Sequence, residues 1–341
     1  MADINNVAPL TKDNPSLQGY FNSLESRIGY RLILGGTRHH GYYPAETKWP
    51  FPITRALRAM EDHLFNSLNL SAEATVLDAG CGAGHVAIYM AKKGLRVFGI
   101  DVVDHHLAKA NRNIKAENLE QQVSAQKMDY HYLDGLQDDS IDAVYTMEAL
   151  VHATNPRQAL REFYRVLKPG GSVALHEYDH VKFSNEEPAT MDKTADGSRG
   201  TNSGGIEANS CVQPSKYLID TWDKINTFAS MPANKEFEQG VLPRMLEDIG
   251  FKNVEVEDLS HNIEPMLRLF FTIAYLPFLL IRLFGLEKRF INTVSGVEAY
   301  RGRKFWRYIV ITCTKPDDAV GRGGLDILEV VKENKNTQRS C

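Results

Sequence analysis

A glycine-rich turn between an apolar strand and a helix constrains the fold of this chain more than any other feature of its sequence. Residues 76–84 read VLDAGCGAG. Glycines at alternate positions let a backbone bend sharply and approach a ligand that a Cβ atom would hold away. A dinucleotide fingerprint, G-x-G-x-x-G, would need glycine at position 85, where the chain has His85. The turn therefore predicts a ligand site of a related but different kind.

Strands and helices alternate around this turn. We expect strands at 74–78, 96–101, 123–128, 141–146 and 172–176, helices at 52–68, 85–93, 104–117, 156–167 and 241–249, and final strands at 254–256 and 308–314. Such alternation is typical of a parallel sheet. The predicted fold class is α/β, a doubly wound, seven-stranded, mostly parallel Rossmann-like sheet with an N-terminal helical and aromatic arm and lid insertions.

Composition divides the chain into a core, an arm, two insertions and a tail. The expected units are an arm and lid at 1–54 with one short helix, a ligand-binding core at 55–182, a mobile loop at 183–214, the rest of the core at 215–316 and a flexible tail at 317–341. Within the second part of the core, 263–290 is an apolar insertion. Its central thirteen residues, Leu269–Ile281, are too few to cross a bilayer, which needs about 20. A buried or lid helix kinked at Pro277 is one interpretation, and a cap over a lipophilic substrate or a membrane-surface patch is the other.

The overall composition excludes several classes of protein. Lys and Arg number 39 against 43 Asp and Glu, so no basic excess attracts a phosphate backbone and no nucleic-acid partner is expected. The four cysteines show no C-x-x-C pair, which argues against a disulfide framework and a structural zinc site, and no metal site is predicted. The N-terminus lacks the basic and apolar pattern of a secretory signal. We expect a cytoplasmic protein, peripheral to a membrane if 263–290 is a surface patch, with a homodimer among the expected assemblies.

Two carboxylates flank the glycine turn. Asp78 disfavours a pyrophosphate and favours a ligand with a cationic end. Asp101 ends the second strand, seventeen residues beyond Gly84, where a carboxylate can accept both ribose hydroxyl protons. A ligand with an ammonium, a sulfonium and a ribose is S-adenosylmethionine, which we predict as the cofactor. The other expected cofactor contacts are Gly80, Cys81, Gly82, Gly84, Val102, Asp129, Tyr130 and Glu148.

Asp129 has two interpretations. It follows the third strand, where its carboxylate would accept from an adenine amino group while apolar atoms sandwich the ring. The alternative is a turn residue that faces solvent.

The order of these motifs resembles a known family. VLDAGCGAG, FGID at 98–101 and SIDAVYTMEALVHATNPRQALREFYRVLKPGG at 140–171 resemble class I S-adenosylmethionine-dependent methyltransferases. Within that class, MEALVHA and REFYRVLKPG look most like sterol 24-C-methyltransferases and the related tocopherol and small-molecule enzymes. HHGYY at 39–43 is similar to their aromatic arm. The resemblance implies an enzyme that methylates a lipophilic small molecule such as a sterol, a prenylated compound or a secondary metabolite.

The candidates for chemistry follow the fourth and fifth strands, because open α/β sheets bind ligands at the carboxyl ends of their strands. Glu148 and His152 follow the fourth strand and His176 ends the fifth. The alternative for His152 is a residue that only lines the cofactor, and for His176 a structural, hydrogen-bonded residue. Tyr43 of the arm is a candidate lid aromatic, and His106, just inside a helix, is expected on the surface.

Methyl transfer is an in-line displacement, so alignment in a dry site is the main task and can supply about 7–11 kcal/mol. The predicted function is S-adenosylmethionine-dependent methylation of a lipophilic small molecule. One alternative is an O-, N- or S-methyltransferase of a specialised metabolite with a histidine base. The other is a regulatory or non-methylating protein on the same fold, because a fold does not fix a function.

Overall fold

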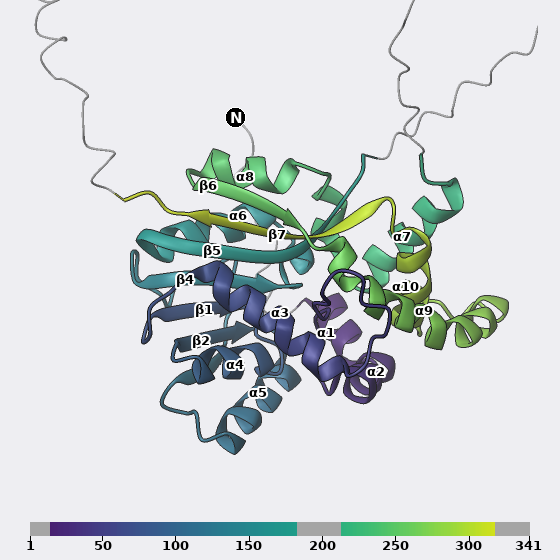
Figure 1. Ribbon diagram of the computed structural model, residues 1–341, viewed down its shortest axis with the longest axis horizontal. Coiled ribbons are helices and arrows are strands. Elements are labelled where there is room, and N and C mark those ends of the chain that lie inside the picture. Colours follow the sequence, from purple (N-terminus) through teal and green to yellow (C-terminus); the bar gives the residue numbers. More distant parts are fainter. Residues whose placement is uncertain (1–13, 183–212, 318–341) are drawn as a thin grey trace, which may run out of the picture.

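A single mixed sheet of seven strands organises the protein (Figure 1). The computed structural model describes residues 14–182 and 213–317, so all but the last two residues of the expected loop at 183–214, and all but the first of the expected tail, lie outside the described residues. The strands are β1 (Thr75–Ala79), β2 (Arg96–Asp101), β3 (Val123–Lys127), β4 (Ile141–Met147), β5 (Leu167–His180), β6 (Lys252–Asp258) and β7 (Trp306–Thr314).

The sheet order is β3-β2-β1-β4-β5-β7-β6, which confirms the predicted doubly wound architecture. β1 to β5 pair in parallel, and β7 runs antiparallel to both β5 and β6. The strand order reverses between β1 and β4, because the chain moves outward first through β2 and β3 and then through β4 and β5. Ligands of such sheets bind beyond the carboxyl ends of the strands at this switch point.

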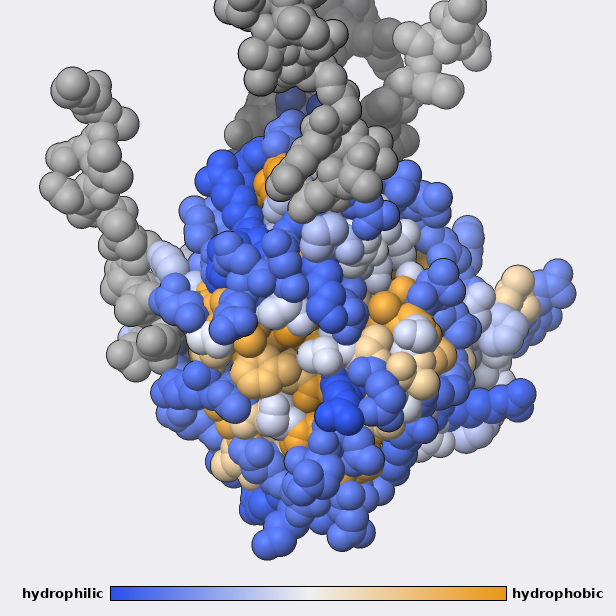
Figure 2. Space-filling view, turned by 90° about the vertical axis from the view of Figure 1, so that its left-hand side faces the viewer, coloured by the Kyte–Doolittle hydropathy of each residue, from blue (hydrophilic) through white to orange (hydrophobic). Residues whose placement is uncertain are grey.

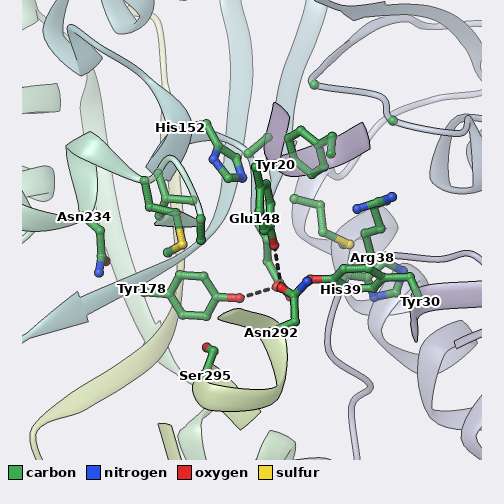
Figure 3. A pocket seen from close by; sticks show the side chains of 18 of the residues that line it. Tyr20, Tyr30, Arg38, His39, Glu148, His152, Tyr178, Asn234, Asn292 and Ser295 are labelled. Atoms are coloured by element: carbon green, nitrogen blue, oxygen red, sulfur yellow. Dashed lines mark hydrogen bonds between the residues drawn. The ribbon is translucent and has the colours of Figure 1, made fainter. Parts of the chain in front are cut away.

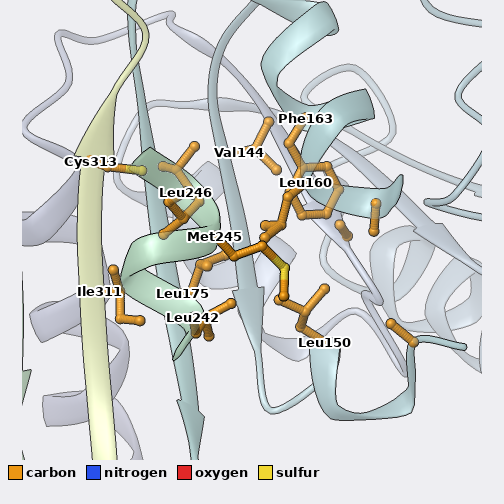
Figure 4. Close-up of a cluster of buried hydrophobic side chains, with 14 of the residues drawn as sticks. Val144, Leu150, Leu160, Phe163, Leu175, Leu242, Met245, Leu246, Ile311 and Cys313 are labelled. Atoms are coloured by element: carbon orange, nitrogen blue, oxygen red, sulfur yellow. The ribbon is translucent and has the colours of Figure 1, made fainter. Parts of the chain in front are cut away.

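Helices cover both faces of the sheet. α3 (Ile53–Leu68), α4 (His85–Lys92) and α5 (Asp104–Ala116) pack on one face, and α6 (Pro156–Val166) and α8 (Val241–Ile249) pack on the other. Successive residues of β4 serve the two cores, since Val144 meets α6 and α8 while Tyr145 meets α3 and α4. Figure 4 shows Leu160 and Phe163 of α6 and Leu246 of α8 in the first of these cores.

Local signals explain why α6 forms as predicted. Asn155 accepts a hydrogen bond from the backbone N–H of Gln158, and Pro156 occupies the first turn, where a missing N–H costs nothing. The buried side chains of the helix recur at intervals of three and four residues. Propensity, capping and burial therefore agree on one helix.

Five further helices gather beyond the carboxyl ends of β1, β4 and β5 (Figure 1). They are α1 (Pro15–Asn22), α2 (Leu24–Leu34), α7 (Lys216–Phe228), α9 (Ser260–Leu283) and α10 (Ile291–Arg301). The expectation of one short helix in the arm is wrong, because α1 and α2 follow one another with only Ser23 between them. Ser23 caps α2 by accepting from the N–H of Ser26, and Gly35, at φ 64°, ends it.

The apolar insertion forms one continuous helix, α9, with Pro265 and Pro277 inside it. The interpretation as a buried helix holds for one face only. Met266, Leu267 and Phe278 are buried, whereas Leu276 and Leu283 are exposed.

Candidate cofactor and substrate site

A cavity of about 790 Å³ lies between the carboxyl ends of the strands and the five gathered helices. This volume falls in the upper part of the range of about 300–1,000 Å³ that ligand sites occupy. One side of the cavity is the turn after β1 and the ends of β2 and β4; the other is built by α1, α2, α7, α9 and α10. Side chains from distant parts of the chain point into it in Figure 3, among them Tyr20, His152, Tyr178 and Asn292.

The glycine turn shapes the cofactor side of this cavity. Gly80, Gly82 and Gly84 all have positive φ angles, of 96°, 52° and 77°. A Cβ atom on Gly80 would lie 2.5 Å from the Cβ of Ala149, and one on Gly84 would lie 3.2 Å from the Cβ of Ala110. A Cβ on Gly82 would meet nothing within 4 Å. Gly80 and Gly84 therefore permit close packing within the protein, and Gly82 leaves room for a ligand to approach the backbone.

Asp101 is held in place at the end of β2. Its carboxylate accepts from the N–H groups of Gly82, at 2.9 Å, and Val103, at 2.7 Å, and lies 3.3 Å from His106 Nδ1. Burial by itself would raise the pKa of Asp101, but the hydrogen bonds and the His106 imidazole hold it below its ordinary value. The carboxylate is therefore ionised and can accept from ligand hydroxyl groups. The expectation that His106 lies on the surface is wrong, because the first turn of α5 directs it inward.

Asp78 presents a buried carboxylate to the same cavity. Only 3% of the residue is exposed, and its Oδ2 atom has no hydrogen-bond partner among the described residues. Burial raises the pKa of Asp78 to about 7, with the Tyr145 hydroxyl opposing this rise and the nearby Asp101 charge adding to it. A buried carboxylate oxygen without a hydrogen-bond partner is costly unless a cation meets it. The site therefore fits the ammonium end of S-adenosylmethionine.

Asp129 and Tyr130 line the cavity beyond β3. The Oδ1 atom of Asp129 accepts from the backbone N–H of His131, at 3.0 Å, and lies 2.6 Å from its ring Nδ1. Asp129 is buried, so the alternative of a solvent-facing turn residue is wrong. Its contact with adenine stays a prediction. Val102 also lines the cavity, and its carbonyl accepts from Gln18 of α1 at 2.8 Å, which fixes the arm over this part of the site.

Glu148 occupies the centre of a hydrogen-bond network. It follows β4 with a φ of 55° and accepts from His40 through the backbone N–H, at 2.7 Å, and the ring, at 3.0 Å. The hydroxyl groups of Tyr178 and Tyr308 donate to it as well. Burial would raise the pKa of Glu148, but His40 and the donated hydrogen bonds lower it to about 2. The cavity therefore contains a fixed negative charge.

His152 reaches the cavity from the short 3₁₀ helix Leu150–His152. Its Nδ1 lies 2.7 Å from the carbonyl oxygen of Ser230. Because a carbonyl only accepts, we assign the proton to Nδ1 and the lone pair to Nε2. Burial lowers the pKa of His152. The ring is therefore neutral at pH 7 and packs edge-on against Phe21.

Two candidate catalytic residues lie outside the cavity. Tyr43 is buried and donates to the carbonyl of Pro50 at 2.9 Å, so its hydroxyl is directed away from the site. His176 is fully buried, and neither ring nitrogen has a hydrogen-bond partner among the described residues. Its ring packs 5.6 Å from that of His63, on the face of the sheet that α3 covers. The burial of His176 outside the cavity agrees with the structural alternative, but the hydrogen bonds expected with it are not formed among the described residues.

Several residues that line the cavity were not predicted from the sequence. Arg38 stacks over the rings of Tyr30, at 4.5 Å, and Phe21, at 5.0 Å. Tyr20 of α1 donates to Asn292 of α10 at 2.7 Å (Figure 3). The arm motif at 39–43 pointed toward Arg38, which directly precedes it. Nothing in the sequence indicated that α10 closes the site.

Comparison with known proteins agrees with this geometry. The sequence profile of the Methyltransferase domain matches residues 77–175. Over 302 residues the chain is 38% identical to an S-adenosyl-L-methionine-dependent Diels-Alderase of Talaromyces variabilis, covering 88% of this chain and 95% of that protein. The chain belongs to the S-adenosylmethionine-dependent methyltransferase family. The cofactor of this methyltransferase-family enzyme is S-adenosylmethionine, as the carboxylates and glycines predicted.

Two further similarities are to a sequence relative and to a solved structure. It is 35% identical over 251 residues to a sterol 24-C-methyltransferase of Saccharomyces cerevisiae, covering 73% of this chain and 56% of that protein. The crystal structure of the [4+2]-cyclase SpnF has the same fold, with a TM-score of 0.63 at 20% identity, and the match covers 91% of this chain and 98% of that one.

The pKa of Asp78 predicts how cofactor affinity depends on pH. Below pH 7 Asp78 is mainly protonated, and binding an ammonium group must expel that proton. We expect S-adenosylhomocysteine to bind about tenfold more tightly at pH 8 than at pH 6. Titration calorimetry at both pH values, in buffers of different ionisation enthalpy, measures the affinity and the released proton. Asp78→Asn should bind weakly with little dependence on pH, and an unchanged pH dependence in that variant would assign the effect to another group.

Proposed function

We propose that this enzyme catalyses a [4+2] cycloaddition of a lipophilic, polyunsaturated small molecule, with S-adenosylmethionine retained and not consumed. The observation that carries the proposal is that Glu148, the one cavity carboxylate predicted for chemistry, already accepts hydrogen bonds from several partners. Glu148 accepts from His40, Tyr178 and Tyr308, and the low pKa of its carboxyl makes it a poor base.

A cycloaddition suits such a cavity because it transfers no proton. The π electrons of a diene and an alkene form two carbon–carbon bonds and one new double bond, so the product is an isomer of the substrate. The enzyme's task is to hold the two reacting ends together, which can supply about 7–11 kcal/mol. The apolar walls from α1, α2, α7, α9 and α10 can fold a flexible chain into one conformation. When bound, S-adenosylmethionine would supply a fixed positive charge that polarises an unsaturated carbonyl group, or a methyl group in the alternative reaction.

The similarity to a Diels-Alderase supports this choice. The Diels-Alderase of Talaromyces variabilis matches this chain over 95% of its own length, whereas the yeast sterol methyltransferase matches over 56% of its length. The match covers 88% of this chain, so it includes most of the segments that wall the cavity as well as the cofactor core.

Methylation of an alkene carbon in a lipophilic acceptor is the second candidate. Such a reaction passes through a carbocation, which a carboxylate and aromatic faces stabilise. The ionised Glu148 between Tyr178 and Tyr308 offers both. An O- or N-methyltransferase would instead need a base, and of the two predicted catalytic histidines the neutral His152 is the one that faces the site.

The mass of the product separates these reactions. We would incubate the purified enzyme with methyl-labelled S-adenosylmethionine and a lipophilic, polyene-rich extract fraction, and follow substrate, product and S-adenosylhomocysteine by mass spectrometry. A cyclase converts a substrate into an isomer of equal mass and leaves the cofactor intact. A methyltransferase adds one labelled methyl group and releases one S-adenosylhomocysteine per product. Label in product would overturn the cycloaddition, and no conversion with intact cofactor binding would favour the regulatory interpretation.

A further inference from the structure

Two helices at the cavity end of the protein expose stripes of large apolar side chains. On α2 the stripe is Leu24, Ile28 and Leu32; on the C-terminal half of α9 it is Leu276, Leu280 and Leu283. We refer to these six residues as the docking face. Leu24, Leu32, Leu276 and Leu283 are each more than 70% exposed. Because residues three or four apart share one side of a helix, each stripe is continuous.

The two helices belong to one end of the molecule (Figure 1). Ile33 of α2 packs in the same cluster as Met266 and Phe270 of α9. Glu25, at the other end of α2, accepts from the backbone N–H groups of Asn292, at 2.9 Å, and Thr293, at 2.7 Å, in the first turn of α10. α2 is therefore fixed against two of the helices that wall the substrate side of the cavity, α9 and α10.

The opposite sides of the same helices line the cavity. Gly29 and Ile33 of α2 and Phe270 and Ala274 of α9 face it, and Ile273 both lines it and is 44% exposed. The wall between cavity and exterior is thus one helix thick and has apolar side chains on both sides. A lipophilic molecule can cross such a wall without leaving an apolar environment.

Cations surround the docking face. Arg27 and Arg31 on α2, and Lys288 and Arg289 after α9, are exposed and form no ion pair among the described residues. Arg282 lies 3.9 Å from Glu287. The whole chain has a formal charge of −4, so attraction of this face to an anionic surface would come from these local cations and not from the net charge. An apolar stripe flanked by basic residues is the pattern of a helix that lies on an anionic membrane.

The opposite end of the protein has a different surface. Figure 2 shows that end, where hydrophilic side chains dominate and the apolar ones form separate patches between them. A membrane would therefore contact the α2 and α9 end.

We propose that the docking face binds the cytosolic leaflet of an anionic bilayer and that lipophilic substrate reaches the cavity from the membrane between α2 and α9. Among the described residues α9 is the one helix long and apolar enough to span a membrane. It lies on the surface instead, because Phe278 and Ile281 are buried against Ile225 of α7 and Val294 of α10. The access route rests on the proposed lipophilic substrate; the membrane binding does not.

Flotation of the full chain with vesicles tests the proposal. We expect binding to phosphatidylcholine vesicles that contain about 30% phosphatidylserine, weaker binding to pure phosphatidylcholine, and a loss at high salt. The triple variant Leu276→Gln, Leu280→Gln, Leu283→Gln should lower the vesicle partition coefficient at least tenfold. Because these side chains are exposed, its melting temperature and its affinity for S-adenosylhomocysteine should not change. Val256→Gln, which alters an exposed apolar residue of β6, is the matched control and should bind like the wild type.

Three results would overturn the proposal. The wild type could fail to bind either vesicle, or the triple variant could bind as the wild type does. Light scattering could instead show a dimer that the triple variant dissociates, with no vesicle binding, which would assign the docking face to a second copy of the chain. None of these results bears on cycloaddition with a detergent-dispersed substrate, so failure here and failure of the proposed function are distinguishable.

Discussion

Replacing Asp101 with asparagine is expected to weaken binding of S-adenosylhomocysteine about 100-fold. Two hydrogen bonds from ribose hydroxyl groups to a buried carboxylate contribute about 1.5–3 kcal/mol each, and 1.4 kcal/mol corresponds to a factor of ten. Asparagine also replaces one of the two acceptor oxygens with an amide N–H₂, so the hydrogen bond from either Gly82 or Val103 would be lost. Titration calorimetry at pH 8 measures the effect, because Asp78 is then ionised.

Asp104→Asn is the matched control for this prediction. Asp104 lies three residues further along, in the first turn of α5, where its side chain is 72% exposed and paired with Lys127 at 2.8 Å. At Asp104, the same change of charge should alter the affinity for S-adenosylhomocysteine less than twofold. Wild-type affinity in Asp101→Asn, with an unchanged melting temperature, would show that this carboxylate does not hold the ribose.

The cofactor half of the site could be predicted because its determinants are local. The turn at 76–84 needs positive φ angles that favour glycine, and Asp78 and Asp101 end adjacent parallel strands. Parallel strands place their carboxyl ends at one edge of a sheet, so a correct assignment of two strands already brings the two carboxylates together. No contact between residues far apart in the sequence was needed to predict the cofactor half of the site.

The side of the sheet to which each side chain of β5 points could not be predicted in the same way. His176 and Glu177 are both fully buried, so no alternation of polar and apolar residues indicates which of them faces which side. A shift of one residue along the strand would exchange the sides to which His176 and Glu177 point. In the structure Glu177 accepts from the N–H groups of Ala149 and Leu150 below the cavity, and His176 lies against α3.

The substrate half depends on packing between segments far apart in the chain. His40 meets Glu148, and Glu25 meets the start of α10, across 108 and 267 residues. The individual segments show helical or aromatic character, but nothing in them encodes their partner. Tyr43 illustrates the limit: the arm does cover the site, yet within the motif at 39–43 the residues that line the cavity are His39 and His40.

Glu148→Gln is expected to lower turnover about 100-fold while changing cofactor affinity less than threefold. The carboxylate now accepts from His40, Tyr178 and Tyr308, and one half of a glutamine amide can only donate, so at least one of these donors would lose its partner. A donor left unsatisfied in a buried site costs about 1–3 kcal/mol, and misplacement of groups around the reactants multiplies the loss in rate. The conversion measured by mass spectrometry gives turnover, and calorimetry gives affinity. Proteolysis near His40 should also become faster, because the arm loses its anchor.

Glu177→Gln tests whether the loss of turnover expected for Glu148→Gln comes from its negative charge or would follow the replacement of any buried glutamate nearby. Burial raises the pKa of Glu177 to about 8, so this neighbouring glutamate is largely protonated at pH 7, and glutamine resembles its neutral form. Its Oε1 atom accepts from Ala149 and Leu150, which the amide oxygen of glutamine can also do. We therefore expect turnover close to that of the wild type.

Equal losses in the two variants would mean that the buried hydrogen bonds matter and the charge does not. A large loss confined to Glu148→Gln would assign the effect to the ionised carboxylate that faces the cavity, because the two residues share the same end of the sheet and differ in charge.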